Sequence, residues 1–271
     1  MSWRINSVLV ILFISSCQQK GEGEKENFLT TRTVVRSNYL IEAEDLQKIT
    51  LHPNIKLVDF RKREDFEKEH IEGAINIWRS DIEDTSYPYK GIMASPLQIE
   101  TLFSQLGISN DDTLIIYDDN GLCDAARLWW VLENYDFTQV KLLHGGLVAW
   151  KQINEALSAL TTDPAPTNFQ LSKTPSMKYY SSLEDIKGAI HGNTLILDTR
   201  SVDEFSGKRM KKGASKGGRI PESKLVDWSE SVNYTGDKKF KSTEELSAIY
   251  SQLAAEKRDT IIVYCHSGVR S

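Results

Sequence analysis

One structural unit occurs twice in this chain of 271 residues, and the duplication constrains the fold more than any other feature. Residues 59–66 match residues 198–205 in the pattern Asp-x-Arg-x-x-acid-acid-Phe, and residues 103–117 match residues 250–264 without a gap. Each copy begins with a strand pattern, at 57–60 and 195–198, followed by helical segments and a second strand. Strands that alternate with helices predict a parallel sheet. The sequence therefore predicts an α/β protein of two tandem domains, each a parallel sheet with helices on both faces.

The second copy ends with a strand pattern followed by a cysteine. Residues 261–264 form a continuous apolar run, which predicts a strand buried on both faces of its sheet. Cys265 follows directly, at the carboxyl end of the strand, where open α/β sheets bind ligands. If the next five residues curl around the sulfur, their N–H groups form an anion-binding nest that stabilises the thiolate. Arg270 would add a positive charge and hold an anionic substrate. The alternative for a lone cysteine is a small buried core residue.

The spacing Cys-x-x-Gly-x-Arg over residues 265–270 resembles the active-site loop of the rhodanese sulfurtransferase family. Tyrosine phosphatases of the same fold have a similar loop with one more residue between cysteine and arginine, so the shorter loop favours sulfur transfer. The resemblance implies a thiosulfate or 3-mercaptopyruvate sulfurtransferase with Cys265 as catalytic nucleophile. Its thiolate would take sulfur from a small anionic donor and pass it, through a cysteine persulfide, to cyanide or a thiol. The residues expected to form the loop or support it are His266, Ser267, Gly268, Val269, Arg270, Asp198 and Arg200.

Two other functions remain open: a non-catalytic protein that binds sulfur or anions, and a phosphatase or arsenate-reductase-like enzyme on the same fold. By the resemblance, Glu204 occupies the position of an arginine that contacts substrate in the family. A basic insertion without counterpart in the first copy follows it, and either restores the missing positive charge or is a solvated loop. Its basic residues are Lys208, Arg209, Lys211, Lys212 and Lys216. No cluster of His and Cys predicts a metal site, and no cofactor is implied.

The first copy is expected to be non-catalytic. Because Tyr117 matches Tyr264, the residue at the position of Cys265 is Asp118. A carboxylate cannot form a persulfide and would repel an anionic donor. Cys123 matches Arg270, and we expect it to be structural, with a redox partnership with Cys265 as the alternative.

The domain boundaries follow from the repeat. The first domain is predicted at 28–160, a proline-containing linker at 161–175, and the catalytic domain at 176–271. In the first copy a helix and a strand follow the residue that matches Arg270, whereas the sequence of the second copy stops one residue beyond it. We therefore expect the second domain to be truncated at its C-terminus.

The first residues resemble the export signal of a bacterial lipoprotein. Arg4 precedes an apolar run at 8–14, which is too short to span a bilayer, and Cys17 follows two serines. We expect a signal peptide at 1–17, lipidation of Cys17, and a polar tether at 18–27. The alternative is an ordinary signal peptide with an incidental cysteine. The expected location is the bacterial cell envelope, with membrane attachment only through the lipid. A net charge of -5 gives no support to nucleic-acid binding.

Overall fold

The computed structural model describes residues 37–161, 163–256 and 259–271. The predicted signal peptide, Cys17 and the tether at 18–27 therefore lie outside the described residues. Within the described part of the chain, no helix is long and apolar enough to cross a membrane.

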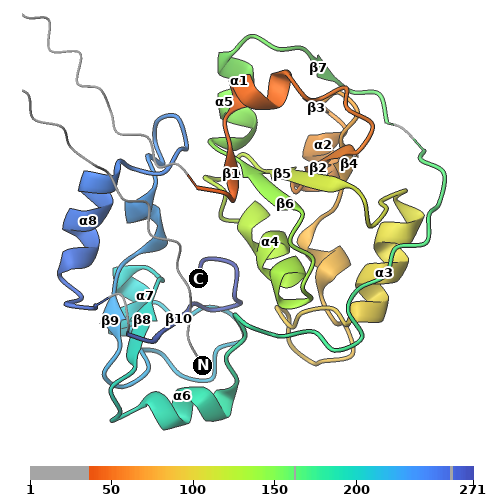
Figure 1. Ribbon diagram of the computed structural model, residues 1–271. Helices are drawn as coiled ribbons and strands as arrows, with labels where there is room; N and C mark the ends of the chain where they lie inside the picture. Colours follow the sequence, from red (N-terminus) through yellow and green to blue (C-terminus); the bar gives the residue numbers. More distant parts are fainter. Residues whose placement is uncertain (1–36, 162, 257–258) are drawn as a thin grey trace, which may run out of the picture. The chain divides into compact units, whose positions relative to one another are not determined.

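The first copy forms a five-stranded parallel sheet in the order β1-β6-β5-β2-β4 (Figure 1). Its elements are, in chain order, β1 (Leu40–Ile41), α1 (Ala43–Gln47), β2 (Ile55–Asp59), α2 (Arg63–Phe66), β3 (His70–Ile71), β4 (Ile75–Asn76), η1 (Arg79–Ile82), α3 (Pro96–Gln105), β5 (Thr113–Tyr117), α4 (Ala125–Asn134), β6 (Val140–Leu143), α5 (Gly146–Gln152) and β7 (Leu157–Ser158). Strand β7 pairs with β3 in a small antiparallel sheet.

Helices cover both faces of the first sheet, as predicted, because alternate residues of the strands point to opposite sides. Ile116 of β5 belongs to a core that includes Phe103 of α3 and Leu128 of α4. Its neighbour Ile115 belongs to a separate core that includes Leu147 of α5. The central strand β5 is buried from Leu114 to Tyr117, which is the expected property of an interior strand in a parallel sheet.

The second copy forms a three-stranded parallel sheet in the order β10-β8-β9. Helix α6 packs on one face through Ala189, and α8 packs on the other through Ile249. The elements are α6 (Leu183–Ala189), β8 (Leu195–Asp198), α7 (Val202–Ser206), β9 (Lys224–Leu225), η2 (Trp228–Ser231), α8 (Thr243–Ser251) and β10 (Ile261–Tyr264).

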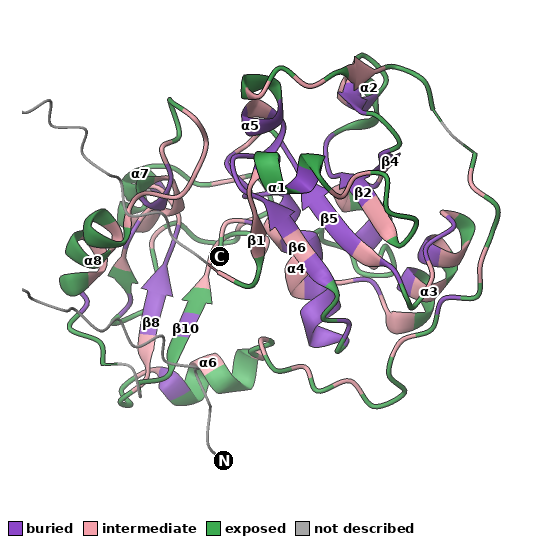
Figure 2. Cartoon of the chain, turned by 45° about the horizontal axis from the view of Figure 1, so that its top comes forward, coloured by how far each residue is buried: buried purple, intermediate pink, exposed green. Residues whose placement is uncertain are grey.

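Strand β10 begins and ends where the sequence predicted, but its burial on both faces was predicted wrongly. Within the described residues it lies at the edge of its sheet and pairs with β8 alone. Ile261 and Val263 remain 41% and 42% exposed, whereas Ile262 between them is buried against α6. Figure 2 shows the contrast between the exposed parts of β10 and the buried β8. An apolar run predicts a strand, but the number of its faces that are buried depends on the elements that pack against it.

The proline-containing segment between the domains packs on the first domain over much of its length. Phe169 is 2% exposed and lies in the core of the first domain, against Phe103 and Phe137. The N–H of Leu171 donates to Glu100 on α3. The segment predicted as a linker therefore belongs structurally to the first domain.

Candidate active site

The sulfur of Cys265 lies inside a turn of the backbone at the carboxyl end of β10. The N–H groups of Gly268 and Arg270 donate to Sγ over 3.1 and 3.4 Å. Gly268 has φ +67°, a left-handed conformation that a glycine adopts without strain, and this allows the chain to close around the sulfur. The predicted nest is present.

The surroundings of Cys265 favour the thiolate. Burial alone would raise the pKa of the thiol, but the N–H groups of Arg270, Ser267 and Val269, together with the charge of Arg270, outweigh burial and lower the pKa. Because a thiolate is the nucleophilic form of cysteine, the site is built for a reactive sulfur.

Asp198 and Arg200 hold the residue that precedes the cysteine. The Arg200 guanidinium donates to both oxygens of the Asp198 carboxylate, and the hydroxyl of Tyr264 donates to the same carboxylate over 2.6 Å. The guanidinium also donates to the carbonyl oxygen of Gly218, over 2.8 Å. The two residues, which the sequence analysis expected to support the loop, contact Tyr264 directly before it.

Arg270 is placed differently from the prediction that it holds a substrate anion. Its two terminal nitrogens donate to the two oxygens of Glu204, over 2.8 and 2.9 Å. Glu204 is 3% exposed, and this pairing, only partly opposed by burial, lowers its pKa to about 2. The guanidinium is therefore already neutralised by a carboxylate. Glu204, where the sequence departs from the family pattern, and Arg270 of the loop therefore form one ion pair.

The first domain repeats the same backbone arrangement around a carboxylate. Asp118 is fully buried and accepts hydrogen bonds of 2.9 Å from four N–H groups, those of Asn120, Leu122, Asp124 and Ala125. Asp118 follows Tyr117 as Cys265 follows Tyr264, and each tyrosine lies opposite an aspartate of the neighbouring strand. The carboxylate fills the position at which a thiolate or a bound anion would sit.

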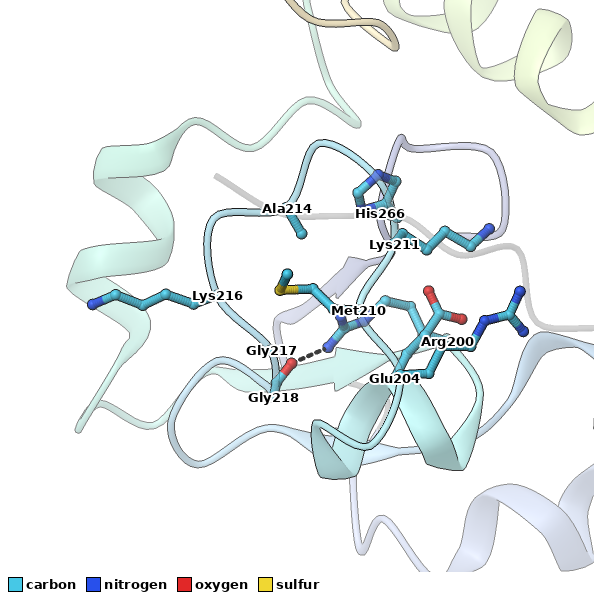
Figure 3. Close-up of a pocket in the computed structure, with 10 residues that line it drawn as sticks. Arg200, Glu204, Met210, Lys211, Ala214, Lys216, Gly217, Gly218 and His266 are labelled. Atoms are coloured by element: carbon cyan, nitrogen blue, oxygen red, sulfur yellow. Dashed lines mark hydrogen bonds between the residues drawn. The ribbon is translucent and has the colours of Figure 1, made fainter.

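The basic insertion lines a small hollow beside the loop, with an empty volume of about 210 Å³ that is open to solvent (Figure 3). Lys211 and His266 both line it, whereas the Lys216 ammonium points away. Cys265 is not among its lining residues, which are Arg200, Glu204, Arg209, Met210, Lys211, Ala214, Lys216, Gly217, Gly218 and His266. None of the cations of the insertion forms an ion pair within the described residues.

Two residues of the first domain reach the loop of the second, and sequence reasoning missed both contacts. Cys123 is buried with its Sγ 3.6 Å from the carbonyl oxygen of Val269, and Arg127 donates to the carbonyl oxygen of Gly268 over 3.1 Å. Burial raises the pKa of the Cys123 thiol well above its usual value. A thiol held protonated in this way is suited to a structural role. No local pattern could have revealed either contact, since more than 140 positions separate the partners.

Known proteins resemble this chain both in sequence and in structure. The sequence matches the Rhodanese-like domain family over residues 42–153 and 182–271. A protein of Mycolicibacterium smegmatis, provisionally named as a thiosulfate sulfurtransferase, is 33% identical over 213 residues, which cover 76% of this chain and 74% of the relative. A protein of Mycobacterium tuberculosis with the same provisional name is 32% identical over 88% of this chain and 86% of its own. The crystal structure of SseA from Escherichia coli, a 3-mercaptopyruvate sulfotransferase, superimposes with a TM-score of 0.76 at 26% identity, over 86% of this chain and 90% of SseA.

Proposed function

Because this chain belongs to the rhodanese-like family, we propose that it is a sulfurtransferase in which Cys265 carries the transferred sulfur. The observation that supports this role is the turn of N–H groups around Sγ, with Gly268 N at 3.1 Å and Arg270 N at 3.4 Å. The same turn in the first domain holds Asp118, which has no sulfur to transfer.

The reaction has two half-steps. The Cys265 thiolate attacks the outer sulfur of thiosulfate, a sulfur–sulfur bond forms, and the sulfur–sulfur bond of the donor breaks, so that sulfite leaves with the electron pair. Cyanide or a thiolate then attacks the outer sulfur of the persulfide, and the thiolate of Cys265 leaves with its electron pair. Neither step needs an oxidant. In each step the N–H groups around Sγ stabilise the negative charge that Cys265 carries as free thiolate.

We propose that the hollow beside the loop receives the charged end of the donor. Since Arg270 is paired with Glu204, its charge is not available, whereas Lys211 and Arg209 line the hollow without an ion pair in the described part of the chain. Thiosulfate is the first candidate, because the sequence relatives carry its name. Mercaptopyruvate, which the name of the SseA enzyme suggests, is the second.

The Glu204–Arg270 pair also favours one rival, a binding protein without turnover, because a neutralised arginine captures anions less well. The deciding experiment is intact mass spectrometry of the full chain after incubation with thiosulfate or mercaptopyruvate. One added sulfur atom, removed by cyanide with release of thiocyanate and absent in Cys265→Ser, supports sulfur transfer. Bound donor without a persulfide would establish the rival, and hydrolysis of a phosphate ester would establish a phosphatase.

Substitutions of two adjacent lysines test whether the hollow binds the donor. Lys211 lines it and Lys212 does not. We expect Lys211→Ala to raise KM for thiosulfate about fivefold with little change in kcat, the size of one exposed ionic contact of about 1 kcal/mol. Lys212→Ala should leave KM unchanged. Equal effects of the two substitutions would contradict the assignment, because they would reflect net charge alone.

We also propose that Cys17 anchors the protein to a bacterial membrane of the cell envelope through an acyl lipid. The support is the sequence pattern alone: a basic residue, the short apolar run at 8–14, and a cysteine after two serines. Cys17 would then be the first residue of the mature chain, and the polar tether at 18–27 would follow it.

A further inference from the structure

Three consecutive peptide groups of the loop turn their N–H sides toward the sulfur of Cys265. The N–H groups of Gly268 and Arg270 donate to Sγ, and that of Val269 between them lowers the pKa of the thiol. The carbonyls of the same three peptide groups belong to Ser267, Gly268 and Val269. A trans peptide directs its C=O away from its N–H, so these three oxygens face away from the sulfur.

Each of the three outer oxygens meets a different group of the first domain. Arg127 Nη1 donates to the Gly268 oxygen over 3.1 Å, and Cys123 Sγ lies 3.6 Å from the Val269 oxygen. Gly91 lies so close to Ser267 that a Cβ at that position would be 2.9 Å from the Ser267 oxygen. The backbone that surrounds the sulfur is therefore held from outside by the other domain.

Arg127 is the centre of this support. It is buried, with 7% exposed, and its second terminal nitrogen donates to the carbonyl oxygen of Gly91 over 2.9 Å. It thereby joins the first-domain turn at Gly91 to the loop of the second domain. Its guanidinium also lies over the ring of Trp130, at 4.6 Å.

The charge of Arg127 is balanced differently from that of Arg270. Arg270 has the Glu204 carboxylate, whereas Arg127 forms no salt bridge in the described part of the chain and only interacts with Glu83 at longer range. Arg127, Arg270 and Cys123 are among the described groups that interact electrostatically with Cys265. Of these, Arg127 is the cation without a paired carboxylate. Burying a cation without a counterion costs free energy, and a nearby thiolate offsets part of that cost.

We propose that the first domain, which has no nucleophile of its own, completes the thiolate site of the second: Gly91, Arg127 and Cys123 fix the outward carbonyls of the loop, and Arg127 is the positioning residue for Cys265. Arg127 and Cys123 contact the oxygens of Gly268 and Val269, and Gly91 packs against that of Ser267, so that the attached N–H groups stay aimed at the sulfur. The inference rests on the proposed function in taking Cys265 as the reactive sulfur, and it gives the non-catalytic copy a direct part in the chemistry.

The test measures the thiolate itself. The full chain is treated with iodoacetamide over a range of pH, and alkylation of the peptide that contains Cys265 is quantified by mass spectrometry. We expect Arg127→Met to raise the pKa of Cys265 by about one unit, which lowers the alkylation rate at neutral pH up to about tenfold. Arg127→Lys keeps the charge but cannot bridge both carbonyls, and should fall between. Arg63→Met, an exposed arginine of the same domain paired with Glu67, should match the wild type.

A second variant covers the case in which Arg127→Met does not fold, which thermal unfolding would reveal. Gly91→Ala places a methyl group against the Ser267 oxygen and should also raise the pKa of Cys265. A wild-type pKa in Gly91→Ala and in every folded Arg127 variant would overturn the proposal. Alkylation reports the thiolate whether or not sulfur is transferred. A wild type that forms no persulfide would therefore overturn the proposed function and leave this test intact.

Discussion

At the scale of residues, the two loops enclose Asp118 and Cys265 in the same turn of N–H groups, yet the pKa values of the two side chains shift in opposite directions. Asp118 is enclosed by four N–H groups, yet complete burial dominates and raises its pKa to about 6. Cys265 is less buried, and there the N–H groups and Arg270 outweigh burial, so that its pKa falls. A carboxylate uses the nest to satisfy a buried charge, whereas a thiolate uses it to become reactive.

The pH dependence of Cys265 follows from the direction of its pKa shift. A lowered pKa means that the thiolate persists to lower pH than in a free cysteine, whose pKa is about 8.5. We expect the alkylation rate of Cys265 to rise with pH through a midpoint below that value and then to level off. Cys123, whose pKa is raised, should react only at higher pH and serves as the internal comparison. A midpoint for Cys265 at or above that of free cysteine would contradict the arrangement of N–H donors.

The Glu204–Arg270 pair predicts an acid-dependent loss of stability. The pKa of Glu204 is lowered from 4.5 to about 2, so the pair stabilises the fold fully above pH 4.5 and loses this contribution as the pH falls through 2. We expect Glu204→Gln to destabilise the second domain by roughly 3 kcal/mol at neutral pH, because it leaves the charge of Arg270 without a counterion. Urea unfolding over pH 2–7 measures both effects. Glu184→Gln, an exposed glutamate paired with Lys187, should change little, and an equal loss in both variants would argue against a specific role of the pair.

At the scale of elements, a segment that the sequence marks as a connection is part of a core. Phe169 lies between Phe103 of α3 and Phe137, and the hydroxyl of Ser104 accepts from its N–H. Prolines and polar residues surround it, so local composition gives no sign of its burial. One aromatic side chain fixes the path of the chain as it leaves the first domain.

Phe169→Ala should therefore destabilise the first domain. Removing a buried phenylalanine typically costs about 3–5 kcal/mol, from lost burial and the cavity that remains. Leu160→Ala in the same connecting region is the matched control, because Leu160 is 81% exposed and should have little effect. Urea unfolding followed by tryptophan fluorescence measures both. A small loss for Phe169→Ala would mean that the segment does not hold its position on the domain.

At the scale of the whole molecule, the chain consists of two related copies with different residues at the matching position. Both keep the strand-end unit of aspartate, arginine and tyrosine: Asp59 binds Arg61 as Asp198 binds Arg200. The copies differ in the residue inside the turn. Other contacts join them away from the loop, such as the hydrogen bond from Phe240 N–H to His144 and the ion pair of Lys239 with Glu42.

The proposed lipid anchor predicts where the whole molecule is found. In a bacterial host with lipoprotein processing, the wild-type chain should sediment with membranes. Cys17→Ala should release it, because the acyl chains that anchor a lipoprotein firmly are attached to this cysteine. Sulfur transfer per molecule should be unchanged, since Cys17 lies far along the chain from Cys265. Membrane fractionation with an assay of both fractions decides the matter. A Cys17→Ala chain that still sediments would show that another feature anchors the protein.

The sequence by itself determined the architecture and placed Cys265 at the carboxyl end of a strand. The repeat, the periodicity of apolar residues and the spacing after Tyr264 are local properties, and they sufficed to predict two parallel sheets, strands at 195–198 and 261–264, and Asp118 in the place of Cys265. Only the tertiary structure decided which partners meet across long separations. It paired Arg270 with Glu204, left two side chains of β10 exposed at a sheet edge, buried Phe169, and laid Arg127 and Cys123 on the loop. The physical reason is that ion pairing, burial and carbonyl contacts depend on three-dimensional proximity, which no pattern along a single strand or helix encodes.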